Sequence, residues 1–227
     1  ALGVPVYELA GGPMRERQRV YWSHCGSSRM DNAELIGVPP LNTWADVTAL
    51  GKEVVERGFT ALKTNPLIPH EEPSTWHRLL GGFGGGPGTT DGNVSNQFLD
   101  SIRTQIGTLR DAVGPYVDIA LDLNFNFRVE AAKRICKALE EFRMMWVEID
   151  IYEPEGLREI RDSTSVPICS GENLITSRDY RRYFEARAMD VCMIDLPWNG
   201  FTESIKVANM AETFDINVAP HNYYSHL

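Results

Sequence analysis

Residues 117–149 decide the fold class; they read VDIALDLNFNFRVEAAKRICKALEEFRMMWVEI. The stretch opens with an apolar run over 117–123 and closes with another over 145–149. Between them, small and apolar residues recur at the spacing of one helix face: Ala132, Ile135, Cys136 and Leu139. Runs that are apolar almost throughout are typical of parallel strands covered on both faces. The stretch therefore predicts a strand–helix–strand unit of a parallel α/β fold.

The same alternation extends in both directions from this unit. Five further apolar runs are predicted as buried strands: 19–22, 61–63, 166–169, 191–194 and 217–219. Helical periodicity is found in the segments 46–57, 98–113, 180–184 and 207–214. Alternating strands and helices without a glycine-rich first turn favour a barrel over a doubly wound sheet. A complete barrel has eight strands and about 250 residues, so we expect a (β/α) TIM-type barrel that is incomplete, with about seven strands.

One long segment interrupts the alternation. Residues 66–97 contain PHEEP at 69–73 and GGFGGGPG at 81–88. The glycines do not predict a phosphate-binding loop, because no strand leads directly into them and no helix directly follows. A loop of this length in a compact domain is typical of a lid or a binding loop. We therefore expect a lid-like insertion at 66–97.

Composition and charge exclude some classes of partner. The chain has 227 residues and a formal net charge of −9, which argues against a nucleic-acid surface. Apolar runs fall short of the roughly 18 residues that cross a bilayer, so no membrane span is predicted. The four cysteines, Cys25, Cys136, Cys169 and Cys192, show no CxxC spacing. Buried reduced thiols suit a cytoplasmic protein. Separately, we expect the protein to form a homo-oligomer.

Polar residues stand where successive predicted strands end. In chain order they are Lys63 with Asn65, Asp122 with Asn124, Glu148, Glu172, Asp195 and His221. In barrels of this kind, catalytic groups lie at the carboxyl ends of the strands. We therefore expect these side chains to share one rim.

Three of these residues are carboxylates on consecutive strands. Asp122, Glu148 and Glu172 would repel one another if brought together, and a divalent cation removes that repulsion. Hard oxygen ligands favour Mg²⁺, or Mn²⁺, over Zn²⁺. We predict one Mg²⁺ per chain on these three residues. The alternative is that they are separate strand-end caps.

The next two strands supply a candidate base. A carboxylate at Asp195 that accepts the Nδ1 proton of His221 would orient the imidazole and leave Nε2 to take a proton. The alternative for His221 is a structural histidine. His24, after the first predicted strand, is a further candidate for the same rim.

Several motifs, taken together, resemble the mandelate racemase branch of the enolase superfamily. They are GVPVYELAGG at 3–12, Lys63-Thr-Asn65, Asp122-Leu-Asn124, Val147-Glu148, Gly171-Glu172-Asn173, Gly200-Phe-Thr-Glu203 and Ala219-Pro-His221-Asn222. The resemblance implies the family's (β/α)7β barrel at 19–227, preceded by a linker at 1–18. It further implies a capping domain before Ala1 and a last strand after Leu227.

The resemblance also implies an activity. Mg²⁺ on Asp122, Glu148 and Glu172 would bind the carboxylate of a small acid, and His221 with Asp195 would exchange the proton α to that carboxylate. The enediolate left behind must be stabilised as it forms. Lys63 is expected to act beside the substrate carboxylate.

Two departures from the family pattern narrow this expectation. Many relatives have Lys-x-Lys on the second strand, whereas this chain has Asn65, which cannot take a proton near neutral pH; a two-base racemase is therefore disfavoured. Lys-x-Asn is similar to acid-sugar dehydratases of the galactonate type. Those have a histidine where this chain has Asn124, so His221 would serve as base and then as acid. Asn65, Asn124 and His24 are expected to contact substrate.

The fourth strand also departs, with Glu148-Ile-Asp150 where relatives usually have Glu-Glu-Pro. Strand alternation places Glu148 and Asp150 on the same face, so Asp150 competes with Glu148 as a ligand.

The predicted function is a Mg²⁺-dependent acid-sugar dehydratase, a hydro-lyase. The alternatives are a one-base epimerase or cycloisomerase of the same superfamily, and a non-catalytic relic that binds metal and carboxylate.

Overall fold

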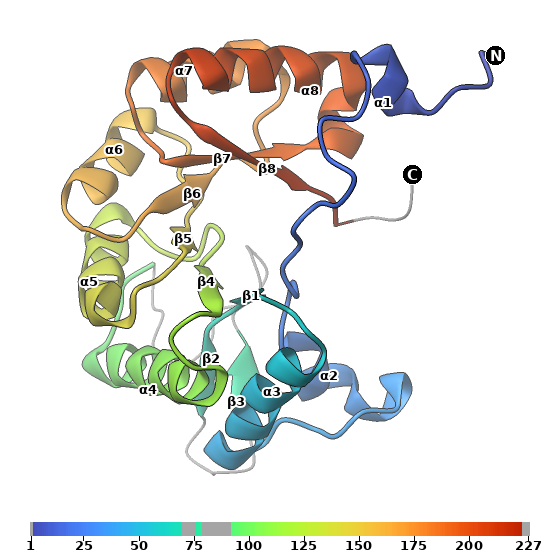
Figure 1. Cartoon of the computed structure of the whole chain (residues 1–227). Coiled ribbons are helices and arrows are strands. Elements are labelled where there is room, and N and C mark those ends of the chain that lie inside the picture. Colours follow the sequence, from blue (N-terminus) through green and yellow to red (C-terminus); the bar gives the residue numbers. More distant parts are fainter. Residues whose placement is uncertain (1, 70–75, 79–91, 224–227) are drawn as a thin grey trace.

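A computed structural model describes residues 2–69, 76–78 and 92–223 of the chain. Its centre is a six-stranded parallel sheet that curls into a half-barrel (Figure 1). The strands in spatial order are β1 (Ala61–Thr64), β4 (Asp118–Asp122), β5 (Trp146–Glu148), β6 (Ile168–Ser170), β7 (Val191–Asp195) and β8 (Asn217–His221). The predicted parallel α/β barrel architecture is confirmed in this incomplete form.

The predicted first strand at 19–22 is wrong as an element. Trp22 alone joins the sheet, through an isolated parallel bridge to Leu62 at the outer edge of β1. The preceding residues do not bury: Val20 is 63 % exposed, and the Arg19 side chain reaches out to Asp118 at 2.7 Å. The segment therefore meets the edge of β1 at Trp22 only, and the exposed residues before it do not extend the pairing.

The predicted insertion holds a short antiparallel pair. This pair is β2 (Leu67–Pro69) with β3 (Trp76–Arg78). Most of the remaining segment, 70–75 and 79–91, lies outside the described residues, so the lid stays a prediction.

Helices cover the outer face of the curled sheet (Figure 1). They are α3 (Trp44–Glu56), α4 (Asn96–Val113), α5 (Val129–Leu139), α6 (Pro154–Asp162), α7 (Thr176–Glu185) and α8 (Leu196–Thr213), with a short 3-10 turn η1 (Glu140–Phe142). The four segments of helical periodicity thus lie in α3, α4, α7 and α8, and the apolar face formed by Ala132, Ile135, Cys136 and Leu139 lies in α5. Two further helices, α1 (Val6–Leu9) and α2 (Ser27–Ile36), belong to the N-terminal segment, which crosses the open side of the half-barrel.

Helix starts follow from local side chains. Thr43 and Asp46 form a reciprocal capping box at α3, which satisfies backbone N–H groups that the first turn leaves free. Ser95 caps α4 by accepting from the backbone N–H of Phe98 at 3.1 Å. Pro154 occupies the first turn of α6, where its missing N–H costs nothing.

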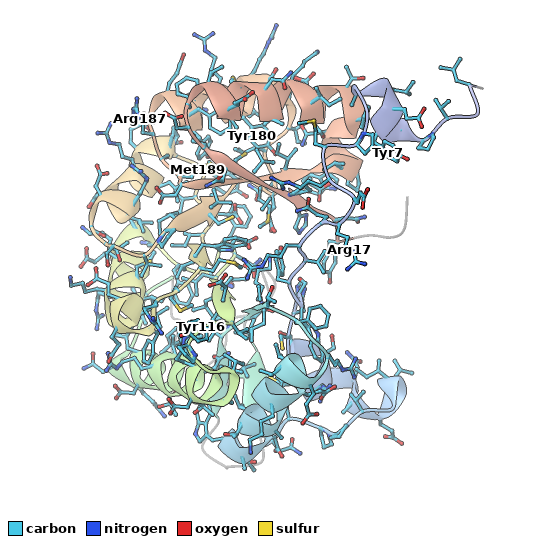
Figure 2. The ribbon with its side chains drawn as sticks, viewed as in Figure 1. Tyr7, Arg17, Tyr116, Tyr180, Arg187 and Met189 are labelled. Atoms are coloured by element: carbon cyan, nitrogen blue, oxygen red, sulfur yellow. The ribbon has the colours of Figure 1, made fainter. Side chains whose placement is uncertain are left out.

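The core has two parts, one on each face of the sheet. The larger lies between sheet and helices and includes Ile106, Ile119 and Tyr180; Figure 2 shows side chains filling this layer. The smaller lies inside the curl and consists of Ala120, Trp146, Cys169 and Met193. All four cysteines are free and buried, as predicted. Within the described residues, no helix combines the length and apolar character of a membrane span.

Candidate functional site

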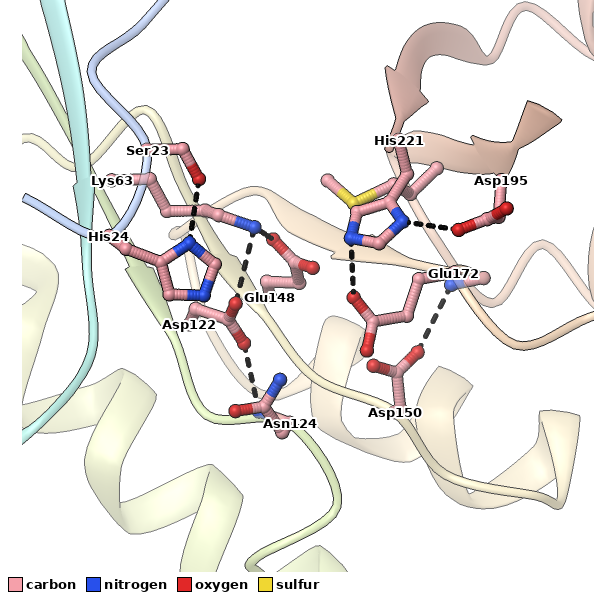
Figure 3. Close-up of polar contacts among 12 residues, drawn as sticks. Ser23, His24, Lys63, Asp122, Asn124, Glu148, Asp150, Glu172, Asp195 and His221 are labelled. Carbon is pink, nitrogen blue, oxygen red and sulfur yellow. Dashed lines mark hydrogen bonds and ion pairs between the residues drawn. The ribbon is translucent and has the colours of Figure 1, made fainter. Parts of the chain in front are cut away.

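The parallel register brings the predicted polar residues to one rim. Asp122 stands opposite Glu148 in the ladder between β4 and β5, and Asp195 stands opposite His221 between β7 and β8. Figure 3 shows these side chains as two pairs, Asp122 with Glu148 and Asp195 with His221. The expectation of one shared rim is confirmed for these four positions.

Lys63 lies between two carboxylates on the neighbouring strands. Its Nζ is 2.7 Å from Glu148 Oε2 and 3.2 Å from Asp122 Oδ2 (Figure 3). All three side chains are buried, at 2 % exposure for Lys63, 3 % for Asp122 and 0 % for Glu148. Burial disfavours the charge on Lys63, but the Glu148 and Asp122 carboxylates outweigh it and hold its pKa well above the usual value.

Glu148 also belongs to a group of three carboxylates. Glu148, Asp150 and Glu172 each offer an oxygen within 4.8 Å of the others. Burial, followed by the charge of Glu172, raises the pKa of Asp150 to about 8. Burial and the charge of Asp122 raise that of Glu148 well above its usual value. Like charges in a dry site favour proton uptake unless a cation enters.

Buried oxygens without partners show that the group suits a hard cation. Glu148 Oε1 and Asp150 Oδ2 are buried and have no hydrogen-bond partner. Orphaned buried acceptors are rare in proteins, and an ion is one of the things that accounts for them. A divalent cation that prefers oxygen ligands therefore fits the residues present.

The carboxylate group differs from the predicted ligand set at one position. Asp150 belongs to it, whereas Asp122 Oδ1 accepts from the backbone N–H of Asn124 at 3.0 Å and Asp122 Oδ2 faces Lys63. Glu148 and Glu172 are common to both sets. Asp122 and Asp150 thus remain the two candidates for the third position.

His221 faces carboxylates through both ring nitrogens. Its Nδ1 is 2.7 Å from Asp195 Oδ2, and its Nε2 is 3.3 Å from Glu172 Oε2. Asp195 is itself fixed, because its Oδ1 accepts from the backbone N–H of Trp198 at 3.0 Å. The histidine is 14 % exposed. The predicted pair of His221 and Asp195 is therefore in contact, with Nε2 directed at the carboxylate group.

The predicted substrate contacts differ in accessibility. Asn65 is 1 % exposed; Ser27 Oγ donates to its Oδ1 at 2.9 Å, and its Nδ2 donates to the Asp122 carbonyl oxygen at 3.4 Å. These protein contacts hold the amide away from solvent, and its contact with substrate stays a prediction. Asn124 is half-buried, and its Oδ1 has no partner.

His24 and His221 both line a cavity of about 1610 Å³. The cavity runs the length of β8, from Asn217 to His221, and Tyr21 and Trp146 line its interior side. His24 Nδ1 is 3.0 Å from Ser23 Oγ. Both histidines therefore border the same cavity.

The loop that carries Glu172 is braced by residues that sequence reasoning missed. Asn199 Nδ2 donates to the carbonyl oxygens of Leu174 at 3.0 Å and Asp195 at 3.1 Å, and so links the loop that follows β6 to the end of β7. Tyr180 Oη donates to the Gly171 carbonyl oxygen at 2.9 Å. These contacts join distant residues through the fold, and the sequence carries no local signal for them.

Gly171 is required by backbone geometry. Its φ is +114°, and a Cβ there would lie 3.0 Å from the Met193 carbonyl oxygen and 3.2 Å from Tyr180 Cε1. We expect Gly171→Ala to lower the free energy of unfolding by about 2–4 kcal/mol, from backbone strain and the close contact together. Urea unfolding measures it.

The matched control for this prediction is Gly37→Ala. Gly37 also has a positive φ, of +66°, but an added Cβ would meet nothing within 4 Å. That variant should lose only about 1–2 kcal/mol. Equal losses for the two variants would contradict the close approach at Gly171.

Glu203 of α8 caps the first turn of α7, the helix that follows the Glu172 loop. Its Oε1 accepts from Ser177 Oγ at 2.6 Å and from the Ser177 N–H at 2.8 Å, and these bonds, with Lys206, lower its pKa to about 2. Because the folded pKa is depressed, this stabilisation is present above about pH 4.5 and is lost as the pH falls toward 2.

We therefore expect Glu203→Gln to lower the melting temperature at neutral pH and to flatten its decline between pH 4.5 and 2. Thermal unfolding by circular dichroism across that range measures it. Glu212→Gln, at an exposed carboxylate on the same helix, is the control and should follow the wild type. A Glu203 variant with an unchanged acid profile would refute the cap.

The sheet curls around an interior, and its parallel strands end in carboxylates and a histidine. These features define a class, the (β/α)-barrel proteins with an acidic site at the carboxyl ends of the strands. The chain belongs to the family described as enolase C-terminal domain-like, which matches residues 46–227. The family predicted from the motifs is thereby confirmed.

Similar proteins include named dehydratases. The chain is 31 % identical over 226 residues to D-gluconate dehydratase of Thermoproteus tenax, and the match covers 98 % of this chain and 39 % of that protein. It is 30 % identical over 224 residues to D-galactonate dehydratase of Variovorax paradoxus, covering 97 % and 50 %. The chain thus spans half or less of these relatives.

A solved structure supports the fold. A protein from Burkholderia xenovorans, named for a proposed L-alanine-DL-glutamate epimerase activity, was solved with magnesium and fumarate. It is 41 % identical, with a TM-score of 0.88, and the match covers 97 % of this chain and 54 % of that one.

Proposed function

We propose that this protein is a Mg²⁺-dependent acid-sugar dehydratase. The observation that carries the proposal is the placement of His221 Nε2 beside Glu172, with Nδ1 on Asp195, next to carboxylate oxygens that have no partners. The named dehydratases at about 30 % identity support the substrate class. We further propose a cytoplasmic homo-oligomer.

The chain's carboxylates are proposed to hold Mg²⁺. Glu148 and Glu172 would be ligands, with Asp122 as the predicted third and Asp150 as its competitor. When bound, the ion would supply positive charge to the substrate carboxylate and to the negative charge that develops when the α-proton leaves. The magnesium and fumarate in the Burkholderia xenovorans structure support this choice of ion and of ligand class.

His221 is proposed to take the α-proton at Nε2. Asp195 would hold the Nδ1 proton and stabilise the imidazolium that forms. The same Nε2 would then return a proton to the departing hydroxide, since Asn124 stands where galactonate-type relatives have a histidine. Lys63 is tied to Glu148, and Asn65 cannot accept a proton, so the chemistry is one-sided.

A second candidate is a one-base epimerase. It is favoured by the name of the Burkholderia xenovorans protein, at 41 % identity. Such an enzyme would exchange the α-proton with solvent without losing water. The non-catalytic alternative predicts binding of metal and acid with no exchange.

The test is an assay of the purified protein with Mg²⁺ against a library of aldonates and aldarates. Formation of a 2-keto acid, abolished by EDTA and restored by Mg²⁺, is expected for at least one acid. The control is the same library with His221→Asn. Deuterium incorporation at the α-carbon without keto acid would replace the dehydratase by the epimerase, and neither product from any acid would overturn both.

A further inference from the structure

Lys63 is a buried cation inside a cluster of carboxylates. Its side chain is 2 % exposed, and its Nζ pairs with Glu148 and Asp122. We propose that Lys63 is the built-in counter-cation of this cluster: it compensates the charge of Asp122 and Glu148 in the metal-free protein and weakens metal binding there by competing for them. The inference rests on the proposed metal site.

The strand order brings Lys63 close to both carboxylates. β1 pairs with β4 and β4 pairs with β5, so Lys63, Asp122 and Glu148 come from three adjacent strands. Lys63 stands opposite Ala120, which lies inside the curl, so its side chain points inward rather than toward the helices. The Tyr21 ring, which lines the cavity, has its centroid 5.8 Å from Nζ.

The Lys63 ammonium does not satisfy every oxygen of its two carboxylate partners. Glu148 Oε2 accepts from Lys63, whereas Glu148 Oε1 is buried without a partner. Asp122 uses Oδ1 for the Asn124 N–H and Oδ2 for Lys63. Any ion held by Glu148 would therefore share that carboxylate with a lysine a few ångströms away. Two positive charges at such distances in a dry site repel strongly.

Burial also limits what else Lys63 can do. A carboxylate substrate would have to draw Nζ away from the 2.7 Å pair with Glu148, and so would uncover a fully buried charge. The lysine is thus a positioning residue, which holds the Asp122 and Glu148 carboxylates side by side.

The test is the affinity of the metal for Lys63→Met, a variant of similar length without charge. Free Mn²⁺ is measured by electron paramagnetic resonance, in the absence of any substrate. We expect the dissociation constant to fall about tenfold or more relative to the wild type, because one nearby positive charge is removed. A lysine with a merely structural role would loosen the site, so an unchanged or higher dissociation constant would overturn the proposal, as would a wild type that binds no Mn²⁺.

Two controls separate charge from folding. Lys63→Arg keeps the charge and should stay within a few-fold of the wild type, and Lys52→Met removes an exposed lysine on α3 and should change nothing. If Lys63→Met does not fold, the melting temperatures of two other metal-free variants decide. Lys63→Arg is expected to fold. The double variant Lys63→Met with Asp122→Asn is expected to recover stability, because the repulsion between Asp122 and Glu148 is removed together with the lysine.

Failure to recover any stability in the double variant would refute the counter-cation role. These outcomes are independent of turnover. A protein that binds Mn²⁺ more tightly after Lys63→Met but acts on no sugar acid would refute the dehydratase and keep this inference.

Discussion

Replacing His221 by Asn is expected to reduce turnover on any accepted acid by about 10²–10⁴-fold, the usual contribution of a positioned general base. Asn keeps a polar side chain of similar reach but cannot take the α-proton. The affinity for Mn²⁺ should stay within a few-fold, because none of the carboxylates is removed. Initial rates of 2-keto acid formation and Mn²⁺ titration measure the two effects separately.

The matched control is His24→Asn. His24 lines the same cavity, and its Nδ1 lies 3.0 Å from Ser23 Oγ. It should retain most of the turnover, with any effect in KM. Equal losses of turnover in the two variants would contradict the assignment of His221, and so would a His221→Asn variant as active as the wild type.

Replacing Glu172 by Gln is expected to weaken Mn²⁺ binding by about 100-fold or more, since even supporting groups around a metal contribute 10–100-fold. Glu172 belongs both to the predicted ligand set and to the carboxylate group found in the structure. It is also the partner of His221 Nε2 at 3.3 Å, so turnover should fall even when the variant is saturated with metal. Isothermal titration of metal into metal-free protein measures the affinity.

The control is Glu159→Gln on α6, an exposed carboxylate that pairs with Lys133 at 2.8 Å. It should bind metal as the wild type does. The same titration with Asp122→Asn and with Asp150→Asn decides the third ligand, because the larger loss marks the residue that holds the ion. Wild-type affinity in Glu172→Gln would refute the site.

The strands and their polar ends were predictable because burial on both faces leaves a strong pattern. The runs around Asp122, Glu148 and Asp195 are buried in the structure, and each stops at the rim. Helix α6 left a weaker signal, since in nine residues it buries only Pro154, Leu157 and Ile160. Short helices depend on tertiary packing more than on sequence period.

The contacts inside the site were not predictable from spacing. The pattern places Lys63 and Asp150 at strand ends. Whether the Lys63 ammonium faces substrate or the Asp122 and Glu148 carboxylates depends on side-chain direction and burial, which spacing does not reveal. Asn65 shows the same difficulty, because its contact with Ser27 comes from a helix that was not predicted. Asp150 was recognised as a competitor to Glu148; in the structure it is instead Asp122 that lies outside the carboxylate group.

The most direct measurement follows the α-proton of an accepted acid by proton NMR in D₂O, with Mg²⁺ and either the wild type or His221→Asn. The central claim, one-sided proton transfer by His221 beside a metal-bound carboxylate, predicts that the wild type removes the α-proton as the 2-keto-3-deoxy product forms. The product should carry one solvent deuterium beside the keto group, and the variant should leave the substrate proton intact. An α-proton lost at the same rate in the variant would contradict the claim.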